Sequence, residues 1–185
     1  MRWTSFFTYL SVVALVSAVI SQAFGWTDGR GWFVLFWAVL LLPVSIGLFS
    51  HPMRAPAWGV FAGFWGTLAV VFLVVLQALA VAGVIDGGWT AWPLAVIGIW
   101  IVVASALGFG AEPFPSLVDV LGLLAGAGLI AIWAATEASN PTLLRGAGVA
   151  AAAAYILWGA GIGWVFWSMQ RTSHRFRGVA IEPRT

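Results

Sequence analysis

The chain has 185 residues, of which 62% are hydrophobic and 8% are charged. Soluble domains carry about 25% charged residues, so this chain has too few charges to cover a surface that faces water. The composition therefore excludes a soluble enzyme, a disordered tail and a nucleic-acid-binding domain. It predicts an integral membrane protein of one domain.

Six apolar stretches meet or approach the length that crosses a bilayer, because a hydrocarbon core of about 30 Å needs about 20 apolar residues in a helix. They cover residues 6–24, 31–49, 58–85, 93–109, 117–135 and 146–167. The third is longer than needed and is expected to tilt or to project. The connecting segments are short, so neighbouring helices are antiparallel. The sequence thus predicts an all-α, six-transmembrane-helix bundle with short loops and a basic cytoplasmic tail over 168–185.

The first stretch also fits a secretory signal peptide. Residues 1–5 would be its n-region, residues 6–20 its apolar core, and Ser21-Gln22-Ala23 a small-x-small cleavage site. We favour a retained transmembrane helix, and the signal-peptide interpretation stays open as the alternative.

The placement of arginine predicts the orientation. The side that holds the two termini and the second loop carries Arg2, Arg54, Arg171, Arg175, Arg177 and Arg184, and the other side carries only Arg30 and Arg145. Because basic residues concentrate in cytoplasmic loops, we expect a protein of the plasma membrane with both termini in the cytoplasm. Arg171, Arg175 and Arg177 are expected to bind lipid headgroups.

The 13 Trp residues follow this layout. Indole prefers the headgroup region, and nine Trp fall at or near predicted boundaries: Trp3, Trp58, Trp164 and Trp167 on the inner side, and Trp26, Trp32, Trp89, Trp92 and Trp133 on the outer side. Trp37, Trp65, Trp100 and Trp158 lie well inside the spans, where each N–H group needs a partner.

Small residues at four-residue spacing predict where helices pack closely in lipid. The glycine pairs are Gly59 with Gly63, Gly122 with Gly126, and Gly159 with Gly163, and the first span has a seam of Ser11, Ala14, Ala18 and Ser21. Together they predict a tight bundle, with a seam left over for a partner.

Polar and aromatic residues within the spans are candidates for a ligand site or a helix interface. They are Gln77, Tyr155, Gln22, Trp65, Trp100 and Trp158. Gln77 shares a helix face with Gly59, eighteen residues earlier, because eighteen residues make five helical turns. A hydrogen bond from Gln77 across a helix pair is favoured over a ligand contact.

Asp119 is the one acidic residue inside a predicted span. Such residues are functional candidates, but Ser116 and Asp119 have the spacing of a capping box at a helix start. We therefore expect a helix cap in preference to an ion or proton site, and a solvated Glu112 in the preceding loop.

Most groups that carry chemistry in membranes are missing. The chain has no Cys and no Lys, and its two His, His51 and His174, lie outside the spans. The sequence offers no facing His pair for haem, no metal-ligand spacing and no Schiff-base lysine. We expect no catalytic activity, cofactor or metal. An inner-face lipid-modifying enzyme that uses Asp119, Glu112 and His51 is the least favoured alternative.

Two hypotheses about function remain. The first is a non-catalytic subunit that packs within a larger membrane protein complex, in contact with lipid, isoprenoid or pigment. The alternative is a small transporter component that binds a small apolar or aromatic substrate through Gln77, Tyr155, Gln22 and the inner Trp residues. The expected partners are membrane lipids and other membrane subunits, and not nucleic acid.

Overall fold

The computed structural model describes residues 2–49, 56–108 and 115–177, and these ranges contain helices and no strand. The elements are α1 (Arg2–Ala23), α2 (Thr27–Phe49), α3 (Pro56–Val81), the short 3-10 helix η1 (Gly87–Thr90), α4 (Ala91–Gly108), α5 (Ser116–Glu137) and α6 (Pro141–Arg177). All six α-helices are long and apolar enough to cross a membrane. The predicted all-α bundle of six spans is confirmed, and the protein is a multi-pass membrane protein.

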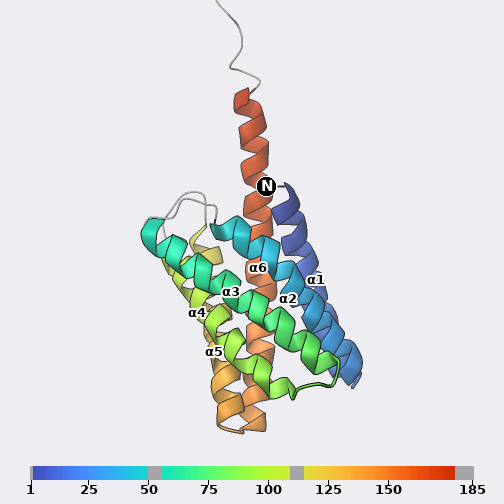
Figure 1. Cartoon of the computed structure of the whole chain (residues 1–185). Coiled ribbons are helices and arrows are strands. Elements are labelled where there is room, and N and C mark those ends of the chain that lie inside the picture. The colour runs from blue at the N-terminus through green and yellow to red at the C-terminus, as the bar shows by residue number, and fades with distance from the viewer. Residues whose placement is uncertain (1, 50–55, 109–114, 178–185) are drawn as a thin grey trace, which may run out of the picture.

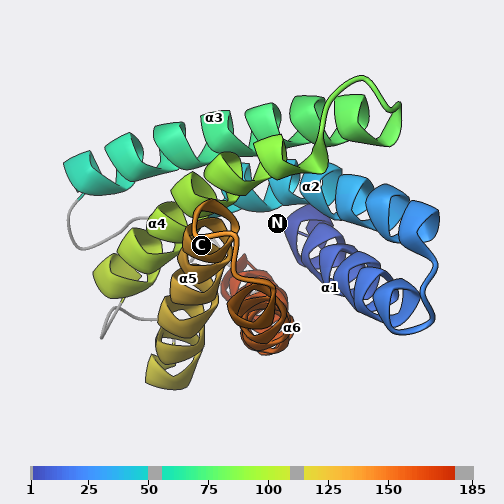
Figure 2. The same ribbon diagram turned by 90° about the horizontal axis from the view of Figure 1, so that it is seen from below.

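The six helices form a closed ring (Figures 1 and 2). Each helix packs against the next one along the chain, and α6 completes the ring by packing against α1. The interior is filled by apolar side chains from the ring, among them Leu41 of α2, Leu73 of α3 and Ile97 of α4, none of which is exposed. Short connections between antiparallel helices produce this order directly.

Three turns at one end of the bundle share a helix-ending motif. After α1, Trp26 N–H donates to the Ser21 carbonyl (2.9 Å) and Gly25 N–H to Gln22 (3.2 Å), and φ of Gly25 is +72°. The same pair of bonds follows α3 at Gly83 and α5 at Ser139, both with positive φ. This Schellman pattern satisfies the last carbonyls of each helix, and Gly adopts positive φ without strain.

Helix α3 runs obliquely across the bundle, as its excess length predicts (Figure 1). It packs against α2 and α4, its neighbours along the chain. Only 22% of the residues in the most apolar segment of α3 are buried, whereas the corresponding share is 44% in α4 and in α6. One face of α3 is therefore left outside the ring.

Helix α6 is longer than the sequence analysis predicted. The expected span ended at residue 167, but the helix continues to Arg177 and projects beyond the bundle (Figure 1). Residues 168–177 contain no Gly or Pro to stop it, and Gly178 follows. Arg171, Arg175, Arg177 and His174 therefore lie on a helix, although their side chains are outside the described part.

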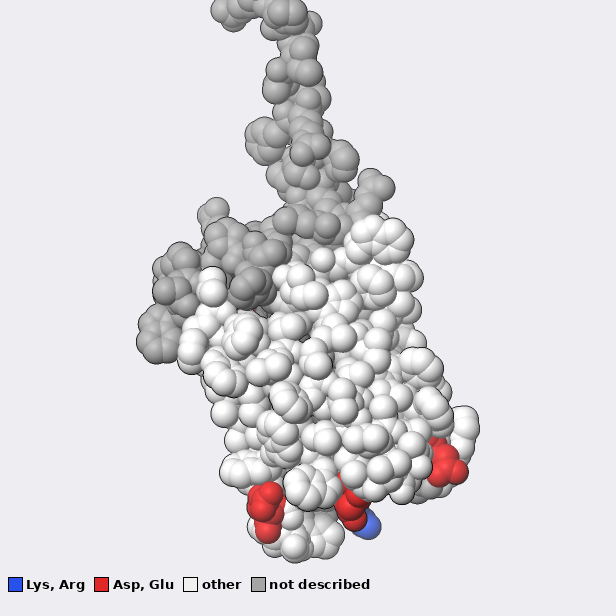
Figure 3. All heavy atoms as spheres, viewed as in Figure 1, with Lys and Arg blue, Asp and Glu red and all other residues white. Residues whose placement is uncertain are grey.

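The charged side chains that the structure describes gather at one end, with a single exception. Asp28, Arg30, Asp86, Glu137 and Arg145 are exposed at or near the turns between α1 and α2, α3 and α4, and α5 and α6. Figure 3 shows acidic groups along this edge and none on the side of the bundle above it. An uncharged belt of this kind is what a hydrocarbon layer requires.

Candidate functional site

The polar centre of the bundle is the hydroxyl of Tyr155 on α6. Tyr155 is 1% exposed, and its Oη lies 3.1 Å from Oγ of Ser11 on α1. Ser11 uses its own proton on the Thr8 carbonyl at 2.7 Å, so Tyr155 is the donor to Ser11. The Ser11 hydroxyl of α1 thus links the backbone of α1 to the Tyr155 side chain of α6.

Two indoles enclose Tyr155. The ring of Trp37 meets it edge to face at 5.3 Å, and the ring of Trp158 lies at 5.6 Å. Trp37 is 3% exposed, and its Nε1 has no hydrogen-bond partner among the described residues. Aromatic pairs at these distances stabilise through their quadrupoles and their buried area. The centre is therefore packed with aromatic rings and holds one unpaired N–H group.

The two glutamines are both held by other parts of the protein. Gln77 is buried, and its Nε2 donates to the Gly31 carbonyl at 3.1 Å, which joins α3 to α2. Gln22 is exposed near the charged end, where its Oε1 accepts from Arg30 at 2.7 Å. The structure does not bring these two amides together with Tyr155.

The predicted glycine pairs on α5 and α6 lie at close helix contacts. A Cβ on Gly126 would lie 2.5 Å from the Gly98 carbonyl oxygen of α4. On α6, a Cβ on Gly159 would lie 2.7 Å from Val12, and one on Gly163 would lie 2.9 Å from Tyr9. These approaches need residues without side chains.

The remaining small residues are placed less uniformly. Gly63 of α3 is buried. Gly59 lies in the first turn of α3, where the structure describes the helix but not the burial of its residues. The seam of the first span is buried throughout: Ser11, Ala14, Ala18 and Ser21. Ser5 extends it, because its Oγ donates to the Gly163 carbonyl at 2.8 Å.

Asp119 does not cap α5, so the capping-box prediction is wrong. The residue before the helix is Pro115, no side chain caps it, and Ser116 is exposed. The Pro115 carbonyl accepts from the backbone N–H groups of Val118 (2.8 Å) and Asp119 (3.4 Å). The Asp119 side chain instead turns inward and is 4% exposed, and its Oδ2 has no hydrogen-bond partner.

Ser105 on α4 was missed by the sequence analysis. It is 4% exposed, and its Oγ lies directly against Gly122 of α5, where a Cβ would also meet Nε1 of Trp158 at 2.7 Å. The signal was present, since Ser105 is the only hydroxyl-bearing or charged residue in α4. Gly122 therefore marks the place where polar groups of α4 and α6 meet α5.

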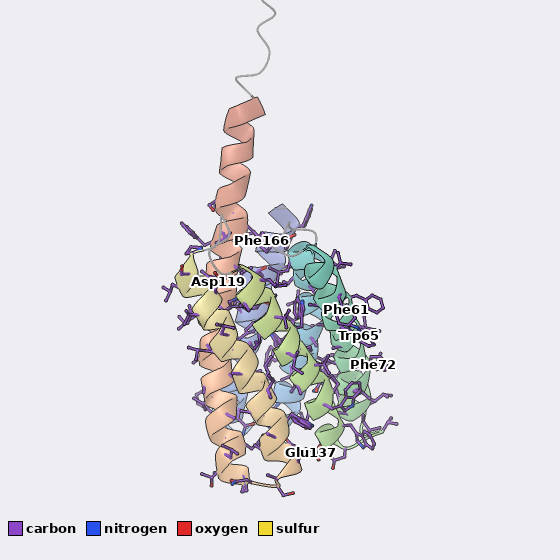
Figure 4. All side chains as sticks on the ribbon, turned by 90° about the vertical axis from the view of Figure 1, so that its left-hand side faces the viewer. Phe61, Trp65, Phe72, Asp119, Glu137 and Phe166 are labelled. Carbon is purple, nitrogen blue, oxygen red and sulfur yellow. The ribbon has the colours of Figure 1, made fainter. Side chains whose placement is uncertain are left out.

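The inner Trp residues divide into two groups. Trp100 and Trp158 are each 2% exposed, and the Trp100 ring packs against Gly66 of α3. Trp65 is 48% exposed and points away from the bundle together with Phe61 and Phe72 (Figure 4). The two groups lie on opposite sides of the ring wall and do not line one site.

The described residues form a depression between α5 and α6. None of the candidate residues borders it. Ala131, Asn140, Thr142 and Leu143 are among the residues that line it. No group of three or more His, Asp or Glu in the described ranges has the geometry of a metal site. Glu112, His51 and Trp58 lie in parts whose side chains the structure does not describe.

Comparisons of the chain with protein-family models, with curated proteins and with solved structures find no match.

Proposed function

We propose that this protein is a non-catalytic subunit of a larger membrane protein complex and that α3 is its contact helix. The supporting observation is the aromatic face of α3, which consists of Phe61, Phe64, Trp65 and Phe72 and is extended by Trp92 of α4. Each of these side chains is at least 40% exposed.

The rings of the aromatic face form two groups in contact, one around Trp65 and one that pairs Phe72 with Trp92. The ring of Trp65 lies 6.2 Å from Phe61 and 5.8 Å from Phe64, and Phe72 lies 5.7 Å from Trp92. Aromatic residues are enriched at the centres of protein interfaces, where a rigid ring buries a large area at a low cost in entropy. The indole N–H of Trp65 also gains an acceptor if a protein covers it, whereas lipid tails offer none.

The interior supports a structural role over substrate transport. A transporter of the alternative kind needs Gln77, Tyr155 and the inner Trp residues to line a common space. Here Gln77 bonds to α2, Tyr155 bonds to α1, and Trp100 packs against α3. In the proposed orientation both termini and the α6 extension are cytoplasmic, which places Arg171, Arg175 and Arg177 at the headgroups or next to a partner.

The test replaces Phe61, Trp65 and Phe72 together by Leu, which keeps the surface apolar but removes the rings. We expect the wild-type chain to migrate in a large assembly on native gels in mild detergent and the triple variant to migrate as the free chain. Because leucine is fully compatible with lipid, loss of membrane insertion does not explain that outcome.

The matched control replaces three exposed aromatic residues on other helices by Leu: Phe6, Phe36 and Trp164, which are 53%, 55% and 58% exposed. This variant should assemble as the wild type does. A wild-type protein that migrates alone, or a triple α3 variant that stays in the assembly, would contradict the proposal.

A further inference from the structure

The buried carboxyl group of Asp119 has no charge partner among the side chains that the structure describes. It lies three residues into α5, at the end of the bundle opposite Glu137 (Figure 4). Its side chain is 4% exposed, and its Oδ2 has no hydrogen-bond partner within the described ranges. A carboxylate in such a place is costly, because burial removes the hydration of Oδ2 and no described group replaces it.

The surroundings of Asp119 disfavour a negative charge. Gly108, the last residue of α4, is so close that a Cβ on it would lie 2.9 Å from Asp119 Oδ1. The C-terminal carbonyls of a helix carry partial negative charge, so the end of α4 repels an anion there. The first turn of α5 would attract an anion, but no side-chain cap bond is made.

No described side chain supplies a compensating charge. From α4, the groups near this part of α5 are Gly108 and Ser105, and α4 has no charged residue. From α6, Trp158 faces Gly122, the next turn of α5. The charged and titratable residues of α6 with described side chains are Arg145, at the far end, and Tyr155, which faces α1.

We propose that Asp119 is a proton-binding site and carries its proton in the folded, membrane-embedded protein. A proton from the aqueous side adds to one carboxylate oxygen, an O–H bond forms, and the group becomes neutral. Because Oδ2 is completely enclosed, a hydrated ion or a basic side chain of another protein has no room beside it, whereas a proton needs none.

This inference does not depend on the proposed subunit function, and infrared spectroscopy of the purified protein tests it. A protonated carboxyl group has a carbonyl stretching band that is separate from the bands of carboxylates and amides. We expect this band at neutral pH in the wild type and its loss in Asp119→Asn. The matched control is Glu137→Gln, at the exposed end of the same helix, which should keep the band.

Thermal unfolding gives an independent readout. If Asp119 is protonated when folded and ionised when unfolded, unfolding releases a proton, so stability falls as the pH rises above about 4, the ordinary pKa of an aspartate. We expect this fall in the wild type and in Glu137→Gln, and a flatter profile in Asp119→Asn.

Three results would overturn the proposal. They are a folded wild type that lacks the infrared band at every pH measured, an Asp119→Asn variant that keeps the band, and a Glu137→Gln variant that loses it. If Asp119→Asn does not fold, wild-type protein with isotope-labelled aspartate decides the question. The band must then shift, because Asp28 and Asp86, the other described aspartates, are exposed to water.

Discussion

Helix α5 packs against α4 and α6 through glycines, whereas α3 presents aromatic rings away from the bundle. On α5, Gly126 approaches the backbone of Gly98, and Gly122 receives Ser105 and Trp158. On α3, Phe61 and Trp65 are about half exposed. Both helices are apolar, and the part of each that could cross a membrane is 22 residues long.

This difference shows that glycines, more than hydrophobicity, mark the faces at which membrane helices make their closest contacts. Lipid tails are as apolar as the protein interior, so burial of an apolar side chain gains little in a bilayer. Close van der Waals packing favours small residues at the closest contacts, whereas large side chains lie both in the interior, as Trp100 and Trp158 do, and on the outer face. Helix α3 therefore exposes a group of aromatic rings, which the proposed partner would cover.

The largest expected effect comes from filling the closest contact of α5. In Gly126→Leu the new Cβ would lie 2.5 Å from the Gly98 carbonyl oxygen, an atom of the backbone that cannot rotate away. We expect a loss of about 3 kcal/mol or more in the free energy of unfolding, or a failure to fold. Unfolding by SDS, followed by circular dichroism, measures it.

The control for this substitution is Gly146→Leu on α6, where a Cβ meets nothing within 4 Å. It should change stability by no more than about 0.5 kcal/mol. Equal losses in the two variants would mean that α5 and α4 are not in close contact.

A smaller effect is expected when the central hydroxyl is removed. Tyr155→Phe keeps the ring between Trp37 and Trp158 but loses the bond to Ser11, which still donates to Thr8. Interhelical hydrogen bonds in membranes are worth about 1 kcal/mol, so we expect a loss of that size in the same unfolding assay. The control is Tyr9→Phe. Because Tyr9 is 40% exposed, this substitution should leave the free energy of unfolding unchanged.

A double-mutant cycle with Ser11→Ala assigns this loss to the pair. The loss caused by Tyr155→Phe should be smaller when Ser11 is already absent. Additive losses would show that the two hydroxyls do not interact.

The smallest effect is expected on the aromatic face of α3. In the isolated protein, Trp65→Leu removes ring contacts with Phe61 and Phe64 but opens no cavity, because the side chain is 48% exposed. The free energy of unfolding should change by about 0.5 kcal/mol or less. A loss as large as that of Tyr155→Phe would show that the face stabilises the bundle itself rather than awaiting a partner.

Much of the fold was predictable, because a span is a matter of length and apolarity. The six stretches read from the sequence correspond to α1–α6 with shifts of a few residues at most ends. The exception is α6, which continues for ten residues beyond the expected end. Those residues are polar and basic, so a criterion of apolarity ends the span there although the helix persists.

The candidate site was less predictable. The small-residue pattern correctly indicated that Gly126 and Gly159 lie at contacts, because glycines at four-residue spacing let a neighbouring helix approach closely. The pattern did not separate Trp65, which faces outward, from Trp100 and Trp158, which are buried. Nor did it show that Ser105 meets Gly122, since partners on different helices are set by their rotation and depth.

By itself, the amino-acid sequence determined the number of crossings, their approximate limits and the near absence of charge between them. These follow from the cost of placing polar groups in hydrocarbon, which acts on each segment separately. Only the tertiary structure decided that Asp119 is buried beside the end of α4 and that Phe61, Trp65 and Phe72 point away from the ring. Inner and outer faces are equally apolar in a membrane protein, so the choice between them depends on the shape of neighbouring helices.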